Sequence, residues 1–85
     1  MSKIKPISNE DLRNLMKGGK VTFVYKKNDS SLRIANGTLN NSLIAQKSKG
    51  GRNNVALAGY SVYFDLDKNA FRCYAESRLV GVVES

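Results

Sequence analysis

The chain has 85 residues, enough for one small domain (1–85), with 14 Lys or Arg against 7 Asp or Glu, no His and one Cys. That inventory excludes a His-based nucleophile pair, a structural zinc site with the usual ligands and an internal disulfide, so we expect a non-enzymatic protein with no cofactor and no metal. No apolar run approaches a membrane span and the N-terminus lacks the apolar region of a secretory signal, so we expect a cytoplasmic protein without membrane contact.

The first predicted element is a short helix that follows Ser8. Ser8 is a typical N-cap, and Asp11 stands at the position where a capping box returns a hydrogen bond. Gly18 is placed to stop the helix in a left-handed conformation. The apolar stripe of this helix consists of Leu12, Leu15 and Met16.

A first hairpin is predicted from residues 21–26 and 32–34, which alternate between apolar and polar side chains. The Asn-Asp pair at 28–29 tolerates the positive φ of a tight turn. A two-residue loop there pairs Tyr25 with Leu32 and Phe23 with Ile34 on the core face. The opposite face would then carry Lys20, Val24, Lys26 and Arg33.

The next segment is less regular. Residues 41–45 could form one helical turn. The run 46–54 contains no apolar residue, no acid and two glycines, which is typical of a mobile surface loop. Its three cations are Lys47, Lys49 and Arg52.

A second hairpin is predicted from residues 60–66 and 71–75, followed by a short strand over 79–83 that Gly81 interrupts. A turn centred on 68–69 gives the inward pairs Leu66–Phe71 and Phe64–Cys73, which makes Cys73 a small core residue. The outward pairs would be Asp65–Arg72, an ion pair, and Tyr63–Tyr74.

These elements predict a mainly β (α+β) domain. One short N-terminal helix and about five short strands fit a small bent sheet or barrel of the SH3-like type. Gly37 and Gly59 are suited to bulges or corners in such a sheet.

Several segments of the two hairpins are similar to one known family. They are 21–27 (VTFVYKK), Arg33 and Ala35, 37–39 (GTL), 63–67 (YFDLD) and Phe71-Arg72. The family comprises small SH3 β-barrel-fold proteins of unknown function from Bacteroidota and large tailed phages. The resemblance implies the fold, and a small basic chain of this kind also resembles the accessory proteins that phages use against host defences.

The charge of the chain is concentrated between Leu12 and Phe64, where nine cations accompany one acid, Asp29. A block this basic indicates a polyanionic partner, and the lack of a recognition helix favours RNA or single strands over duplex DNA. Tyr63 is a candidate base-stacking residue, or else it belongs to an aromatic pair that stabilises the sheet or to a face that the N-terminal helix covers. The candidate nucleic-acid-binding residues are Lys20, Lys26, Lys27, Arg33, Lys47, Lys49, Arg52 and Tyr63.

A second hypothesis belongs to another class. The basic surface could contact an acidic protein, as in a phage-encoded inhibitor or antitoxin that counters a host toxin ribonuclease or another defence protein. The two hypotheses can be combined, because such an inhibitor could hold RNA and its target together. Open sheet edges would also permit a homodimer.

Overall fold

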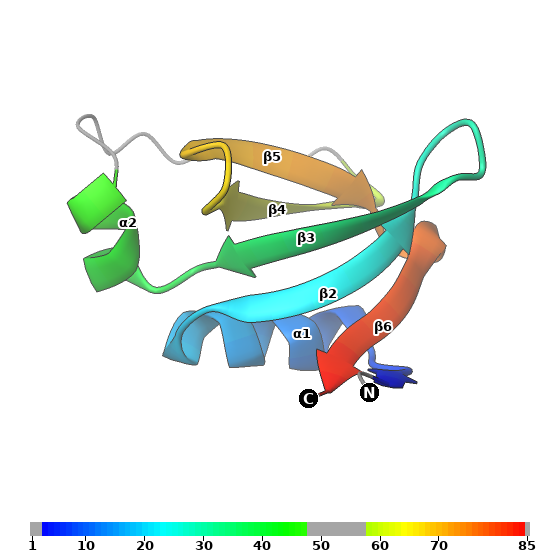
Figure 1. Ribbon diagram of the computed structural model, residues 1–85, viewed down its shortest axis with the longest axis horizontal. Helices are drawn as coiled ribbons and strands as arrows, with labels where there is room; N and C mark the ends of the chain where they lie inside the picture. The colour runs from blue at the N-terminus through cyan, green and yellow to red at the C-terminus, as the bar shows by residue number, and fades with distance from the viewer. Residues whose placement is uncertain (1–2, 48–57, 85) are drawn as a thin grey trace.

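The computed structural model describes residues 3–47 and 58–84, which form a bent antiparallel sheet with helices at its side and end (Figure 1). The helices are α1 (Asn9–Gly18), α2 (Asn41–Lys47) and a single 3-10 turn, η1 (Glu76–Arg78). The strands are β1 (Lys3–Lys5), β2 (Val21–Lys26), β3 (Leu32–Thr38), β4 (Tyr60–Asp65), β5 (Ala70–Ala75) and β6 (Leu79–Glu84).

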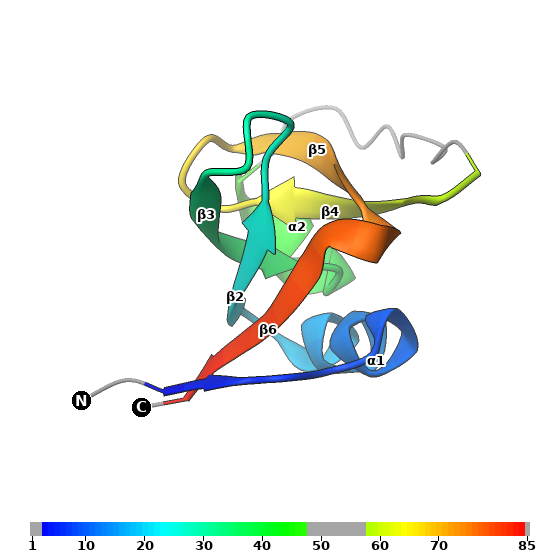
Figure 2. The same cartoon turned by 90° about the vertical axis from the view of Figure 1, so that its right-hand side faces the viewer.

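The strands follow the order β1-β6-β2-β3-β4-β5 in one open, antiparallel sheet. The predicted SH3-like, mainly β fold with a short N-terminal helix is therefore confirmed. The described part has six strands rather than about five, because the short N-terminal strand β1 also joins the sheet. It pairs with the C-terminal strand β6, so the two ends of the described chain lie side by side (Figure 2). No helix in the described ranges is both long and apolar enough to cross a membrane.

Helix α1 begins as predicted and ends one residue later. The backbone N–H of Asp11 donates to Ser8 Oγ at 3.1 Å, which confirms Ser8 as the N-cap. The positive φ lies at Gly19 (155°) rather than Gly18, and the Gly19 N–H donates to the carbonyl of Met16. Leu12 and Met16 are fully buried, but Leu15 remains 50% exposed, so the buried stripe is narrower than predicted.

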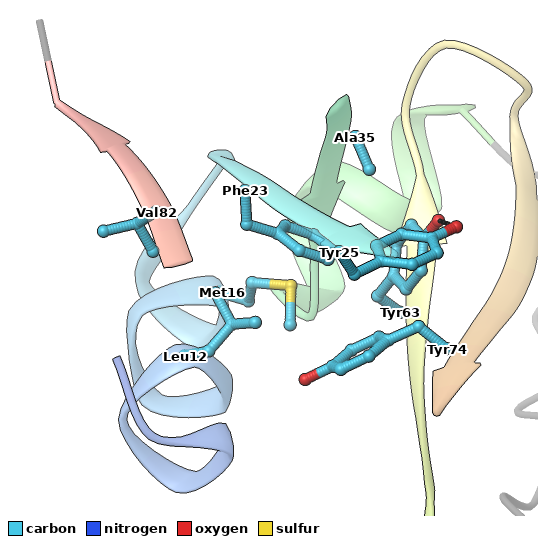
Figure 3. Close-up of a cluster of buried hydrophobic side chains, with 8 residues drawn as sticks. All are labelled: Leu12, Met16, Phe23, Tyr25, Ala35, Tyr63, Tyr74 and Val82. Carbon is cyan, nitrogen blue, oxygen red and sulfur yellow. Dashed lines mark hydrogen bonds between the residues drawn. The ribbon is translucent and has the colours of Figure 1, made fainter. Parts of the chain in front are cut away.

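The core is an aromatic cluster between α1 and the sheet (Figure 3). Tyr63 and Phe23 are completely buried with their rings 5.0 Å apart, edge to face, and Tyr74 is 2% exposed. The hydroxyl groups of Tyr25 and Tyr63 are hydrogen-bonded at 3.1 Å. Burial, reinforced by this hydrogen bond and by the nearby Asp65 carboxylate, raises the pKa of Tyr63. The prediction that Tyr63 and Tyr74 face outward was therefore wrong.

The first hairpin has a different register from the predicted one. Its loop has five residues, 27–31, and Tyr25 pairs with Arg33. Ser30 takes φ = 70° in this loop, and Asp29 Oδ1 accepts hydrogen bonds from the Ser31 N–H and hydroxyl. A shift of one residue exchanges the two faces of β3. Arg33 therefore joins the core face, while the outward-facing side chains of β3 are Leu32 and Ile34, exposed by 57% and 64%.

The second hairpin also departs from the prediction. Phe64 pairs with Phe71, with ring centroids 5.1 Å apart, and Arg72 stands opposite Tyr63 rather than Asp65. Cys73 is exposed, so its assignment to the core was wrong. Phe64 and Tyr63 alternate along β4 and both are fully buried, which means that neither face of this strand is open to solvent there.

Two glycines allow close approaches within the fold. A Cβ at Gly37 would lie 2.7 Å from the ring of Tyr63, and a Cβ at Gly81 would collide with the backbone carbonyl of Lys5. Gly81 is thus required where β6 lies beside β1, and Gly37 is required where β3 passes the aromatic cluster.

Candidate nucleic-acid interface

A basic groove of about 450 Å³ lies beside the loop that joins β2 and β3. One wall is this loop with the end of β2, and the other comes from the start of β4, from β5 and from η1. We call it the basic groove and define it by its lining residues, which are Tyr25, Lys26, Lys27, Asn28, Asp29, Arg33, Tyr60, Arg72, Cys73, Tyr74, Ala75 and Arg78.

Four cations of the basic groove have no acidic partner within ion-pair distance among the described residues: Lys26, Lys27, Arg72 and Arg78. The Arg78 guanidinium donates a hydrogen bond of 2.7 Å to the Lys27 carbonyl, which links η1 to the β2–β3 loop. These cations come from both walls, so their fields add within the space between them.

Arg33 is the fifth cation, and the fold holds it in place. Its side chain is 24% exposed, and one guanidinium nitrogen donates to Asp65 Oδ2 at 3.2 Å. Burial alone would lower the pKa of Arg33, but the hydrogen bonds with Asp65 and Tyr63 outweigh it, so the pKa is raised. The Nε of Arg33 is buried without a hydrogen-bond partner in the described part of the chain, which leaves Asp65 as its principal anchor.

Among the described residues that line the basic groove, Asp29 is the only acid. Its carboxylate accepts hydrogen bonds from the side chain and backbone of Ser31, and these, together with the charge of Lys27, lower the pKa of Asp29. The carboxylate is therefore ionised at neutral pH and shapes the loop, but its one negative charge does not balance the four cations that lack an acidic partner in the described structure.

The structure brings together three of the residues predicted to bind nucleic acid: Lys26, Lys27 and Arg33. Lys20 precedes β2 and so lies at the opposite end of that strand from the groove residues Lys26 and Lys27. Lys47 ends α2 rather than lying in a loop, and Lys49 and Arg52 fall outside the described residues.

The remaining predicted residue, Tyr63, is excluded as a stacking platform because it is completely buried. Arg33 also departs from the prediction, since it belongs to the core face of the hairpin rather than to an outer cationic stripe with Lys20 and Lys26. Arg33 nevertheless reaches the groove, because the groove opens at the end of that same face.

Three groove residues were missed from the sequence: Tyr60, Arg72 and Arg78. Arg72 was assigned to a cross-strand pair with Asp65, but Asp65 binds Arg33 instead. Arg72 and Tyr74 are two residues apart and therefore share one face of β5. This spacing was the one feature of the sequence that could have placed Arg72 in the groove. Tyr60 is 44% exposed at the first position of β4.

A second hollow of about 610 Å³ is lined by residues of α1, α2, β4 and β5 and by the segment between β3 and α2. Of the described residues that line it, Lys17 is the only charged one. Within residues 3–47 and 58–84, no three His, Cys, Asp or Glu side chains are grouped so that they could hold a metal ion. The basic groove is therefore the stronger candidate site in the described structure.

Comparison with known proteins gives a family for this chain. A family model described as WYL_2, Sm-like SH3 beta-barrel fold, matches residues 9–80, which include α1, β2–β5 and the residues of the basic groove. No curated protein and no solved structure matches the chain significantly. The matched range and the observed sheet agree with the SH3-like resemblance of the two hairpins. The chain belongs to the WYL_2 family with the Sm-like SH3 beta-barrel fold.

Proposed function

We propose that this protein is a non-enzymatic nucleic-acid-binding protein that holds single-stranded RNA in the basic groove. The observation that carries the proposal is the convergence on one groove of five cations, from β2, the β2–β3 loop, β3, β5 and η1, with a single acid among the described lining residues. Phosphate contacts of this kind supply affinity with little sequence specificity.

The lining of the groove favours single strands. An exposed tyrosine, Tyr60, lines the groove together with cations such as Arg72. An unstacked base can lie on such a ring while phosphates of the same strand contact the cations, whereas a duplex keeps its bases stacked inside. Tyr60 thus takes the stacking role that the sequence had suggested for Tyr63.

The proposal predicts a steep salt dependence of RNA binding. If four groove cations contact phosphates, the affinity for a single strand should fall about 50-fold between 50 and 200 mM salt. Fluorescence anisotropy with a labelled ssRNA of about ten nucleotides would measure this. Affinity that is undetectable at 50 mM salt, or that is unchanged at 200 mM, would contradict the proposal.

The single cysteine allows the location of the RNA to be tested in the unmodified protein. Cys73 is exposed and lines the basic groove, so bound RNA should slow its alkylation by a neutral reagent such as iodoacetamide. RNA that binds but leaves the alkylation rate unchanged would place the interface elsewhere.

A second candidate function is supported by a different surface. Leu32 and Ile34 are large apolar side chains that lie exposed on the outer face of β3. Such a pair fits a protein-interaction module, and in the phage setting that the resemblance implies, the partner would be a host toxin or defence protein. A pull-down from nuclease-treated host lysate should retain such a partner with the native chain and lose it with Leu32→Ser/Ile34→Ser. Retention by both proteins, or recovery of nucleic acid alone, would contradict this candidate.

A further inference from the structure

We infer that the basic groove binds the phosphorylated end of a single strand, taking one terminal nucleotide with its phosphate monoester. This inference rests on the proposed function and specifies the part of the RNA that the groove accepts. It follows from the volume of the groove, from the arrangement of its cations and from the position of its exposed tyrosine.

The volume of the groove is suited to one nucleotide rather than to a continuous strand. At about 450 Å³ it lies in the lower part of the range of small-molecule sites, which is roughly 300–1,000 Å³. The β2–β3 loop and η1 are joined by the hydrogen bond from Arg78 to Lys27, so two lining segments of the groove are held together. A strand end needs to enter such a site only once, whereas an internal segment has to enter and leave.

The cations that line the groove come from different segments of the chain. Lys27 and Arg78 are linked by a hydrogen bond, Arg72 comes from β5, and the partly exposed Arg33 is anchored by Asp65. A phosphate monoester carries about −1.5 to −2 charges at neutral pH and has three terminal oxygens, while an internal phosphodiester carries about −1. Donors from several segments therefore favour the monoester.

The base that belongs to this phosphate has a surface on which to stack. Tyr60 lines the same groove, pairs across the ladder with Ala75, another lining residue, and is 44% exposed. One ring provides a platform for one base, which agrees with the volume available.

The test compares ssRNAs of one sequence that differ only at their ends: 5′-phosphate, 3′-phosphate, two hydroxyl ends, and a circular form without ends. We expect one phosphorylated form to bind about tenfold more tightly than the hydroxyl and circular forms. Equal affinity of all four would overturn this inference and leave the proposed function standing. Absence of binding by all four would overturn both.

Two variants link the preference to the groove. Arg72→Ala should remove the tenfold preference for the phosphorylated end, while Lys17→Ala, which removes an equal charge at the end of α1, should retain it. Tyr60→Ala should weaken binding of the phosphorylated strand, and Tyr60→Phe should not, since stacking requires the ring and not the hydroxyl. A preference that survives Arg72→Ala at full strength would contradict the assignment to this groove.

Discussion

Asp65→Ala should destabilise the folded protein by about 3 kcal/mol. Asp65 is completely buried, and its Oδ2 accepts the hydrogen bond from the Arg33 guanidinium. Its Oδ1 accepts hydrogen bonds of 2.9 and 3.1 Å from the backbone N–H groups of Asp67 and Lys68, which shape the β4–β5 turn. The alanine variant leaves the three-quarters-buried charge of Arg33 without its partner and leaves the turn without its acceptor.

Thermal unfolding followed by circular dichroism would measure this effect, since a loss of about 3 kcal/mol in a domain of this size lowers Tm by roughly 15 °C. Asp67→Ala is the matched control, because Asp67 is exposed and accepts a single side-chain hydrogen bond, from Asn36. Its cost should stay below about 1 kcal/mol. Equal Tm values for the two variants would show that the Arg33–Asp65 contact does not stabilise the fold.

The triple variant Lys26→Ala/Lys27→Ala/Arg72→Ala should bind ssRNA about 100-fold more weakly at low salt, if each contact contributes about 1 kcal/mol. The three side chains are exposed, so their removal should leave the fold intact. Loss of three phosphate contacts should also reduce the slope of log K against log salt by about 2. Arg33 is left in place, because its loss would disturb the buried Asp65.

The control for this experiment removes the same number of charges away from the basic groove. Lys3→Ala/Lys5→Ala/Lys17→Ala changes exposed residues on β1 and at the end of α1, and none of them lines the groove. It should retain most of the affinity and most of the salt slope. If both triple variants lose affinity equally, binding depends on net charge alone and the groove is not the site.

The faces of β3 illustrate why local pattern was not sufficient. Two apolar residues that flank an arginine indicate a strand with its apolar side inward, and on that reasoning Arg33 faces solvent. In the structure Arg33 faces inward and its apolar neighbours face outward, because Asp65, which is 32 residues away in the sequence, provides Arg33 with a buried partner. The five-residue loop, with Asp29 bonded to Ser31, sets the register that makes this pairing possible.

Tyr63 shows a second limit of the same reasoning. Alternation assigns the residues of a strand to two faces. It identifies the buried face only when the other face carries polar side chains. In β4 both Tyr63 and Phe64 are buried, so the pattern left the choice open. Strands β2 to β6, the N-cap at Ser8 and the helical turn at 41–45 were predictable, because capping chemistry and period depend on neighbouring residues.

The position of β6 between β1 and β2 has a consequence for the synthesis of the protein. Lys3 pairs with Glu84, so the sheet unites residues that leave the ribosome at the beginning and at the end of the described chain. Until β6 has emerged, β1 has no neighbour, β2 has one open edge, and Val82 is missing from the core. Contacts this distant in sequence slow folding and expose unpaired edges in the meantime. The described sheet is therefore complete only after β6 has left the ribosome, and until then β2 keeps an unpaired edge.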